Sequence, residues 1–139
     1  MSQKTILFVC PDNAVLGPMA EACMNAAGKG RVRAFSAGRM PADRLHPGVD
    51  RLLRREGFQT DVLAPKSWDI FALPHAPAVD MVIALSEEVD GDHQPCWTGA
   101  PRHCLWEVAD AASAALPVDE QFRRIRLAVQ RFLANPQSA

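Results

Sequence analysis

The residues best suited to chemistry lie in the stretch FVCPDNAVLGPMAEA, residues 8–22, where Cys10 ends an apolar run and a short loop leads into a helical pattern. A cysteine at the mouth of a helix N-terminus is acidified by the helix dipole and by free backbone N–H groups. The same N–H groups attract a phosphate-like dianion. Such a loop suits attack of sulfur on phosphorus or arsenic through a covalent intermediate, although buried cysteines also end many strands without reacting.

The patterning around this loop predicts the elements that position it. Apolar residues 5–10 predict a buried parallel strand, and Pro18, with Gly17 before it as a cap, predicts a helix that ends near Gly28. Further strands are expected over 32–37, 79–85 and 104–108, helices over 47–57 and 118–133, and a short turn or helix over 66–73.

Alternating strands and helices predict an α/β fold, with three α/β/α layers around a central parallel sheet of about four strands. The 139 residues are enough for one compact domain spanning 1–139. In such folds ligands bind beyond the carboxyl ends of the strands, which is where Cys10 is expected.

Composition narrows the class of protein. A net charge of -1 and 48% hydrophobic residues are typical of a globular domain and give no reason to expect a nucleic-acid partner. The apolar run at the start of the chain is too short for a secretory signal, and no stretch approaches the length of a membrane span. We therefore expect a cytoplasmic protein that has no membrane partner.

The cysteines are expected to remain thiols, because disulfides are rare in the cytoplasm. Four residues of metal-binding types lie close together in the sequence: His93, Cys96, His103 and Cys104. They lack the C-x2-C or H-x3-H spacing that is typical of a zinc site. We predict no metal and no cofactor.

The nucleophile loop is followed by further motifs along the chain. With these motifs, the sequence resembles the low-molecular-weight protein tyrosine phosphatases and the related thioredoxin-coupled arsenate reductases. Those families open with an apolar strand, a C-x5-R-S loop and a helix containing M-A-E. The residues that match in order and spacing, over nearly the whole chain, are Cys10, Asn13, Met19-Ala20-Glu21, Ser36-Ala37-Gly38, His46-Pro47, Gly57, Pro65-Lys66-Ser67, the strand VDMVIAL and Trp106 through Asp110.

The resemblance implies roles for the matched positions. Cys10 would be the nucleophile, Asn13 would hold the backbone turns of the loop, and Asp110 would protonate the leaving oxygen and later activate water. From the local sequence alone, an ordinary loop or helix-capping role for Asp110 is at least as well supported as a catalytic one. The loop that would bind phosphate consists of Pro11, Asp12, Asn13, Ala14, Val15, Leu16 and Gly17.

Three loop residues depart from the family pattern. Leu16 stands in place of the arginine that binds phosphate, Gly17 in place of a serine that hydrogen-bonds the sulfur, and Asp12 in place of a glycine. Loss of such an arginine in phosphoryl transfer costs on the order of 10³ to 10⁵ in rate. An inward carboxylate at Asp12 would repel a dianion and raise the pKa of the Cys10 thiol. We therefore expect strongly impaired hydrolysis of phosphate monoesters.

Other functions remain open. Arg39 is the first choice for a base that replaces the missing arginine, and Arg44 is the next. The reductases' two resolving cysteines fall at Ser86 and Gln94, which disfavours arsenate reduction. If the protein is an impaired enzyme, its substrate is expected to be a phosphorylated molecule or a phosphate-like anion. The alternative is a pseudophosphatase that binds or regulates a protein partner.

Overall fold

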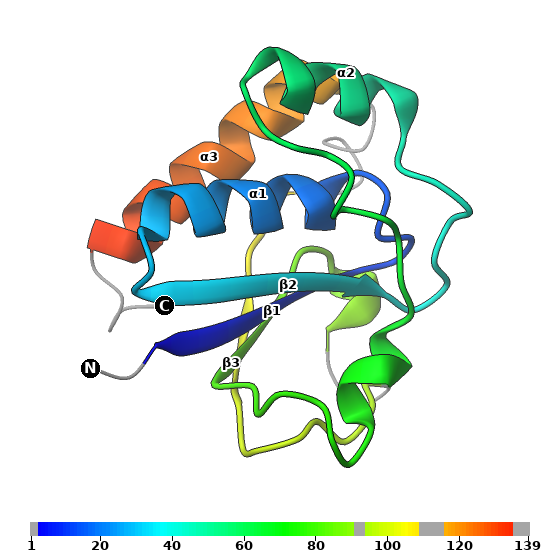
Figure 1. Ribbon diagram of the computed structural model, residues 1–139, viewed down its shortest axis with the longest axis vertical. Helices are drawn as coiled ribbons and strands as arrows, with labels where there is room; N and C mark the ends of the chain where they lie inside the picture. Colours follow the sequence, from blue (N-terminus) through cyan, green and yellow to red (C-terminus); the bar gives the residue numbers. More distant parts are fainter. Residues whose placement is uncertain (1–2, 91–93, 109–115, 135–139) are drawn as a thin grey trace.

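A parallel sheet forms the centre of the molecule in a computed structural model, which describes residues 3–90, 94–108 and 116–134. Its strands are β1 (Lys4–Cys10), β2 (Val32–Gly38), β3 (Met81–Ala84) and β4 (Arg102–Leu105). They lie in the order β2-β1-β3-β4, and each neighbouring pair is parallel (Figure 1). This arrangement confirms the predicted α/β class with its four-stranded sheet.

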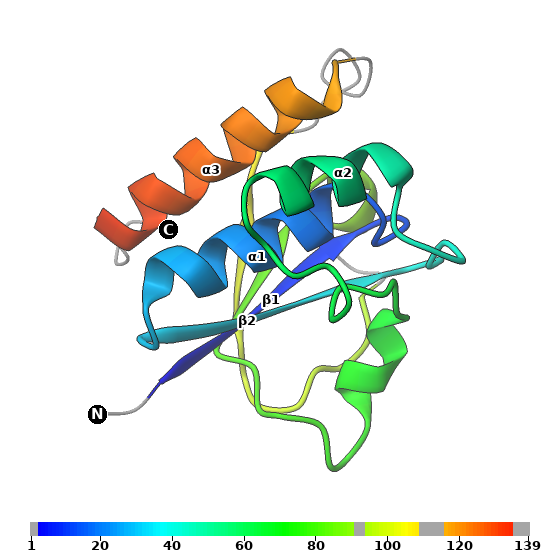
Figure 2. The ribbon, with the colours of Figure 1, turned by 45° about the horizontal axis from the view of Figure 1, so that its top comes forward.

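The helices divide between the two faces of the sheet. The α-helices are α1 (Leu16–Gly28), α2 (Pro47–Arg55) and α3 (Val118–Ala134), and the 3-10 helices are η1 (Trp68–Ala72) and η2 (Glu87–Val89). Figures 1 and 2 show α1 and α3 stacked over one face, with η1 on the opposite side of the sheet. The second outer layer is therefore built from short 3-10 turns and connecting segments instead of long helices.

Strand alternation gives the sheet a separate apolar core on each face. Along β1, Ile6 and Phe8 point into the core shared with α1, α2 and α3, together with Cys10. Leu7 and Val9 point the other way, into a core that includes residues of η1. Cys10 thus ends the central strand with its side chain on the helical face.

Several predicted boundaries differ from the structure by one to three residues, and two of these differences bear on the site. The last strand is Arg102–Leu105 instead of 104–108, because β4 is an edge strand whose exposed polar residues hide it from an apolar pattern. Helix α1 begins at Leu16, with Val15 as its N-cap, so Gly17 is not the cap that the sequence predicted. Gly17 lies in the first turn of α1 instead.

No helix in the described ranges is long and apolar enough to cross a membrane. The prediction of a single domain over 1–139 stays a prediction.

The helical core supplies a test of the packing. Leu53 on α2 is fully buried, whereas Leu73 is 44% exposed. We expect Leu53→Ala to lower the free energy of unfolding by about 2 to 5 kcal/mol, because it leaves a cavity. Leu73→Ala, the matched control, should cost less than about 1 kcal/mol. Urea denaturation measures both, and equal losses would contradict the assigned core.

Candidate active site

The sulfur of Cys10 lies inside a loop of backbone N–H groups. Cys10 is 1% exposed, and the N–H groups of Gly17, Asn13 and Asp12 hydrogen-bond its thiol. These three donors come from the loop and the first turn of α1, where helix geometry leaves N–H groups without intrahelical partners. Three backbone N–H groups therefore surround the sulfur of Cys10.

The loop carbonyls are held on its other side by the segment that follows β2. The carbonyl oxygens of Cys10, Pro11, Asp12 and Ala14 accept hydrogen bonds from the N–H groups of Arg39 (3.3 Å), Met40 (2.9 Å), Ala42 (2.9 Å) and His46 (3.1 Å). A loop whose carbonyls are paired in this way can turn its N–H groups toward the sulfur. One of those groups, on Ala14, instead donates to the carboxylate of Asp12 at 3.1 Å.

Asn13 is the turning point of the loop. Its backbone has a φ of 51°, a left-handed conformation that asparagine tolerates better than most residues. Its buried side chain donates through Nδ2 to Ser36 Oγ at 2.9 Å and accepts the N–H of Lys66 through Oδ1 at 2.9 Å. These two hydrogen bonds tie Asn13 to the end of β2 and to the segment before η1.

The network continues beneath the loop to a buried acid. Ser36 Oγ donates to Glu21 Oε1 at 2.8 Å, and Lys66 Nζ lies 3.9 Å from the same oxygen. Burial raises the pKa of Glu21, and the charge of Lys66 and the Ser36 hydrogen bond oppose that rise. The M-A-E and K-S matches of the sequence thus meet in one polar cluster that supports the loop.

Two glycines let the loop pack closely. A Cβ on Gly38 would lie 2.9 Å from the backbone nitrogen of Asn13, so a side chain there would push the loop away. A Cβ on Gly17 would lie 2.9 Å from Asn13 Nδ2 and 3.0 Å from Cys10 Sγ. A serine at position 17, as in the family pattern, therefore requires a local shift of this loop.

The environment of Cys10 favours the thiol over the thiolate. Burial raises its pKa from 9.0 to about 11 and outweighs the three N–H donors, while the charge of Asp12 adds a smaller increase. Burial thus acts against the acidification that the sequence led us to expect from the helix N-terminus. A pKa of about 11 leaves roughly one thiolate in 10⁴ at pH 7.

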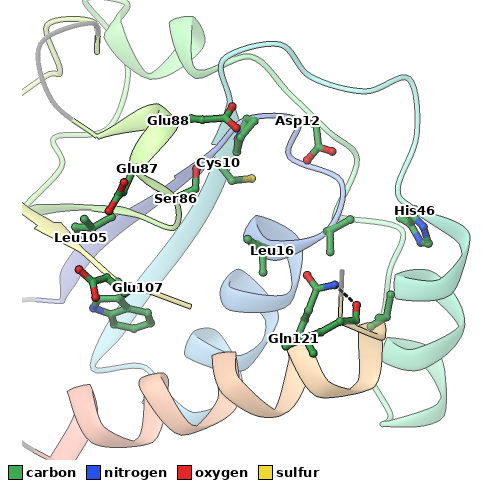
Figure 3. A pocket seen from close by; sticks show the side chains of 15 residues that line it. Cys10, Asp12, Leu16, His46, Ser86, Glu87, Glu88, Leu105, Glu107 and Gln121 are labelled. Atoms are coloured by element: carbon green, nitrogen blue, oxygen red, sulfur yellow. Dashed lines mark hydrogen bonds between the residues drawn. The ribbon is translucent and has the colours of Figure 1, made fainter. Parts of the chain in front are cut away.

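A cavity of about 880 Å³ opens at Cys10, beyond the carboxyl ends of β1, β3 and β4. Figure 3 shows side chains from the nucleophile loop, η2, the end of β4 and the start of α3 around it. This is the point where the chain connections leave the sheet in opposite directions, the usual ligand position in open α/β folds. Of the predicted loop residues, those that line the cavity are Cys10, Pro11, Asp12, Val15 and Leu16.

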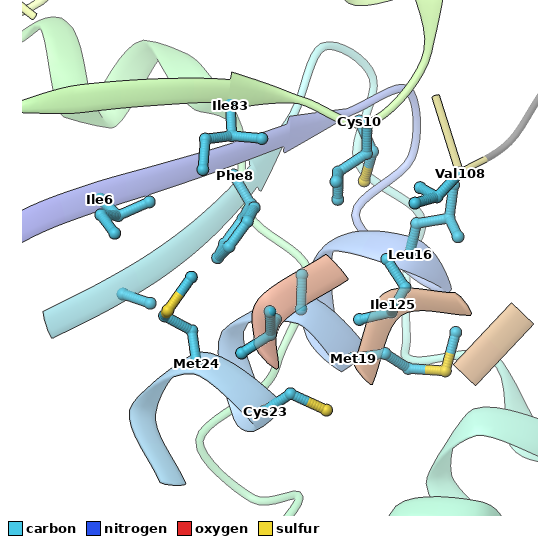
Figure 4. Close-up of a cluster of buried hydrophobic side chains, with 14 of the residues drawn as sticks. Ile6, Phe8, Cys10, Leu16, Met19, Cys23, Met24, Ile83, Val108 and Ile125 are labelled. Carbon is cyan, nitrogen blue, oxygen red and sulfur yellow. The ribbon is translucent and has the colours of Figure 1, made fainter. Parts of the chain in front are cut away.

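Leu16 leaves this cavity without the positive charge of the family's arginine. It belongs to the same buried apolar cluster as Cys10 and Ile125, and Figure 4 shows it between them. Among the described residues that line the cavity, none is a lysine or arginine.

The two other predicted site residues have different outcomes. The Arg39 guanidinium group does not line the cavity; it donates to the carbonyl of Glu88 at 3.3 Å and lies 3.8 Å from its carboxylate. Asp110 lies outside the described residues, so its role as general acid stays a prediction.

Sequence reasoning did not assign most of the cavity's polar lining residues to the site: His46, Ser86, Glu87, Glu88, Glu107 and Gln121. The position of Ser86 directly after a buried strand could have indicated it, because the carboxyl ends of parallel strands meet at one edge. The glutamates have no such signal, because they lie in short segments whose path the sequence pattern does not define. Within the described ranges, no group of three or more His, Cys, Asp or Glu is placed to hold a metal ion.

The fold and the nucleophile loop agree with the comparison to known families. The model of the low molecular weight phosphotyrosine protein phosphatases matches residues 5–125. The chain therefore belongs to this family. None of the curated protein sequences compared with it matches significantly.

Solved structures with the same fold include proteins named as arsenate reductases and proteins named as tyrosine phosphatases. The thioredoxin-dependent arsenate reductase of Corynebacterium glutamicum matches with a TM-score of 0.74 and 23% identity over 97% of this chain, which spans 62% of that protein's length. An arsenate reductase of Archaeoglobus fulgidus matches at 0.72 and 25% identity, over 94% of this chain and 99% of the other. The low molecular weight protein tyrosine phosphatase of Streptococcus pyogenes matches at 0.69 and 18%, over 95% and 92%.

The buried network gives a prediction about stability. Ser36→Ala removes the hydroxyl between Asn13 and Glu21 and leaves both polar groups buried without that partner. We expect a loss of about 2 to 4 kcal/mol in the free energy of unfolding. Ser67→Ala, which removes the half-buried N-cap of η1, is the control and should cost about 1 kcal/mol or less. Chemical denaturation that gives the same loss for both variants would refute the supporting role of Ser36.

The raised thiol pKa values predict loss of stability in alkali. Burial raises the pKa of both Cys10 and Cys23 from 9.0 to about 11, so above pH 9 the unfolded chain releases protons that the folded chain keeps. The free energy of unfolding should fall between pH 9 and 11, by up to about 3 kcal/mol for each thiol. Cys10→Ser should reduce this fall by about half.

Urea denaturation at a series of pH values measures the fall. Cys96→Ser is the matched control, because Cys96 is exposed, and it should leave the pH dependence unchanged. A profile that Cys10→Ser does not alter would mean that the Cys10 thiol ionises as readily in the folded chain as in the unfolded one.

Proposed function

We propose that this family member is a phosphomonoesterase whose nucleophile is Cys10 and whose rate is strongly impaired. The observation that carries the proposal is the position of the Cys10 sulfur at the carboxyl end of β1, inside three backbone N–H donors. Attack of the thiolate on phosphorus would form a phosphocysteine and release the alcohol, with Asp110 supplying the proton to its oxygen. Water would then hydrolyse the thiol phosphate.

Three features of the site support the impairment. The thiol pKa of about 11 leaves little nucleophile at neutral pH. Leu16 supplies none of the charge that an arginine gives to the transferring group, a loss of roughly 4 to 7 kcal/mol in transition-state stabilisation. Asp12 lines the cavity, and its carboxylate takes the Ala14 N–H group that a phosphate could otherwise use.

A pseudophosphatase that binds a partner without catalysis is the second candidate. The observation that favours it is the charge of the cavity, whose described lining includes four carboxylates and no lysine or arginine. A phosphate dianion would meet repulsion there, whereas other ligands would not. Hydrolysis through Cys10 requires a reduced thiol, which agrees with the cytoplasmic location expected from the sequence.

Arsenate reduction by a three-thiol relay is less favoured, although several structures of the same fold are named arsenate reductases. Such a relay needs further thiols that can reach the nucleophile. Ser86 lines the cavity, whereas neither Cys96 nor Cys104 is among its lining residues. The cavity therefore offers Cys10 no second thiol within the described part of the chain.

Hydrolysis of p-nitrophenyl phosphate distinguishes the first two candidates. We expect slow turnover by the wild type that disappears in Cys10→Ser, because the hydroxyl of serine is a much weaker nucleophile. Leu16→Arg should raise kcat/KM by about tenfold or more, because it restores a positive charge beside the sulfur. Gly17 is kept in this variant, since a side chain at position 17 would displace Asn13.

Three controls make the comparison specific. Leu16→Met keeps an apolar side chain of similar size and should not raise the rate. Thermal unfolding shows whether Leu16→Arg remains folded, because position 16 is 8% exposed. Arg39→Gln tests compensation, and a tenfold or greater loss would mean that Arg39 leaves Glu88 to serve the site.

The outcomes separate cleanly. Turnover that persists in Cys10→Ser would contradict the nucleophile. No Cys10-dependent turnover in the wild type, with turnover in Leu16→Arg, would favour the pseudophosphatase. Rapid turnover in the wild type would contradict the predicted impairment.

A further inference from the structure

The cavity above Cys10 has the dimensions of a small-molecule site. Its volume of about 880 Å³ lies within the range of about 300 to 1,000 Å³ that is usual for ligand pockets. A second hollow, beside Cys23, has about 330 Å³. The larger cavity is therefore the better candidate for a ligand, and its lining indicates the ligand's chemistry.

One side of the cavity is apolar and rigid. Its apolar lining residues are Val15, Leu16, Leu105, Trp106, Leu116 and Val118. The Trp106 ring is held by edge contact with Phe8 at 5.4 Å between centroids and by Phe132 at 6.0 Å. A fixed aromatic wall of this kind suits an apolar or aromatic ligand body, and its face also attracts cations.

The polar side is negatively charged. Carboxylates reach the cavity from three separate segments: Asp12 from the nucleophile loop, Glu87 and Glu88 from η2, and Glu107 from the end of β4. Because the chain as a whole has a net charge of only -1, this is a local concentration of negative charge. It opposes the binding of an anion in a family whose name refers to phosphotyrosine.

Within the described ranges, most of that charge has no neutralising partner. Arg39 lies near Glu88, at 3.8 Å, and the Ala14 N–H group donates to Asp12. Glu87 and Glu107 have no ion-pair partner among the described residues, and His46, the one basic residue in the described lining, uses Nδ1 to accept the N–H of Gly48. The cavity thus has at least two carboxylates available to a cationic ligand.

Ser86 adds a polar group with no partner. Its Oγ is buried and makes no hydrogen bond within the described structure, yet Ser86 lines the cavity. Figure 3 places Ser86 beside Cys10 and close to η2. A buried hydroxyl without a partner is costly unless a ligand or water satisfies it, and its oxygen can accept a hydrogen bond from an ammonium group.

We propose that this cavity binds a small organic cation, an ammonium group attached to an aromatic or aliphatic body. The ammonium group donates to Ser86 and faces the carboxylates of Glu87 and Glu107, and the body packs against Leu16 and Trp106. This binding goes beyond the proposed hydrolysis and does not depend on it, because the nucleophile takes no part in it. The substitution of leucine for arginine at position 16 is then a change of ligand class as well as a loss of catalytic charge.

Three ligands that differ only in charge test the proposal on the wild-type chain: 2-phenylethylammonium, 2-phenylethanol and phenylacetate. We expect the cation to bind about tenfold or more tightly than the alcohol, and the anion to bind most weakly, because several screened charge pairs add together. Added salt should reduce the preference for the cation. Isothermal titration calorimetry measures the affinities, and amide chemical shifts locate the site.

Paired variants assign the preference to the cavity. Glu87→Gln with Glu107→Gln keeps the shape of both side chains and should weaken cation binding about 2- to 20-fold while leaving the alcohol unchanged. Asp61→Asn removes an exposed carboxylate outside the cavity and is the matched control. Thermal unfolding confirms that each variant is folded.

Several results would overturn the proposal: equal affinities for the three ligands, tighter binding of phenylacetate, or an undiminished preference in the double variant. These results are independent of turnover of p-nitrophenyl phosphate, so failure of this proposal and failure of the proposed hydrolysis can be told apart.

Discussion

The site depends on one buried hydrogen-bond network, in which Asn13 donates to Ser36 and Ser36 donates to Glu21. This network ties the nucleophile loop to α1 and to the end of β2, and Lys66 adds a bond from the segment before η1. Buried polar groups of this kind are costly when unpaired, so the loop is stable only in the conformation that pairs them all. That conformation also turns the loop's N–H groups toward the sulfur.

Because the cradle is made of backbone, the side chains of the loop can change without destroying it. Asp12, Leu16 and Gly17 all depart from the family pattern, yet the N–H donors still surround Cys10. Asp12 and Leu16 change the charge of the loop, and Gly17 removes a hydroxyl group. The positive charge that would lower the thiol pKa and hold a dianion is missing, and burial then controls the pKa of Cys10. The backbone of this loop thus keeps its N–H groups around the sulfur, while its side chains no longer supply the charge of the family pattern.

The accuracy of the sequence predictions followed the strength of the local signal. The buried strand that ends at Cys10 and the long amphipathic helix near Val118 were found with small boundary errors, because apolar periodicity directly reports burial. The edge strand was placed two residues late, since its exposed residues carry no such pattern. The carboxylates of η2 were missed, because a short 3-10 turn has no period long enough to read.

The sequence by itself determined the family, the register of the nucleophile loop and the absence of its arginine, since these are properties of residue order. Only the tertiary structure decided the electrostatics of the site. Burial depends on which elements cover Cys10, and the negative potential depends on Glu87, Glu88 and Glu107 meeting Asp12 at one end of the sheet. These residues are up to 95 positions apart, from 12 to 107, and only the folding of a parallel sheet brings them together.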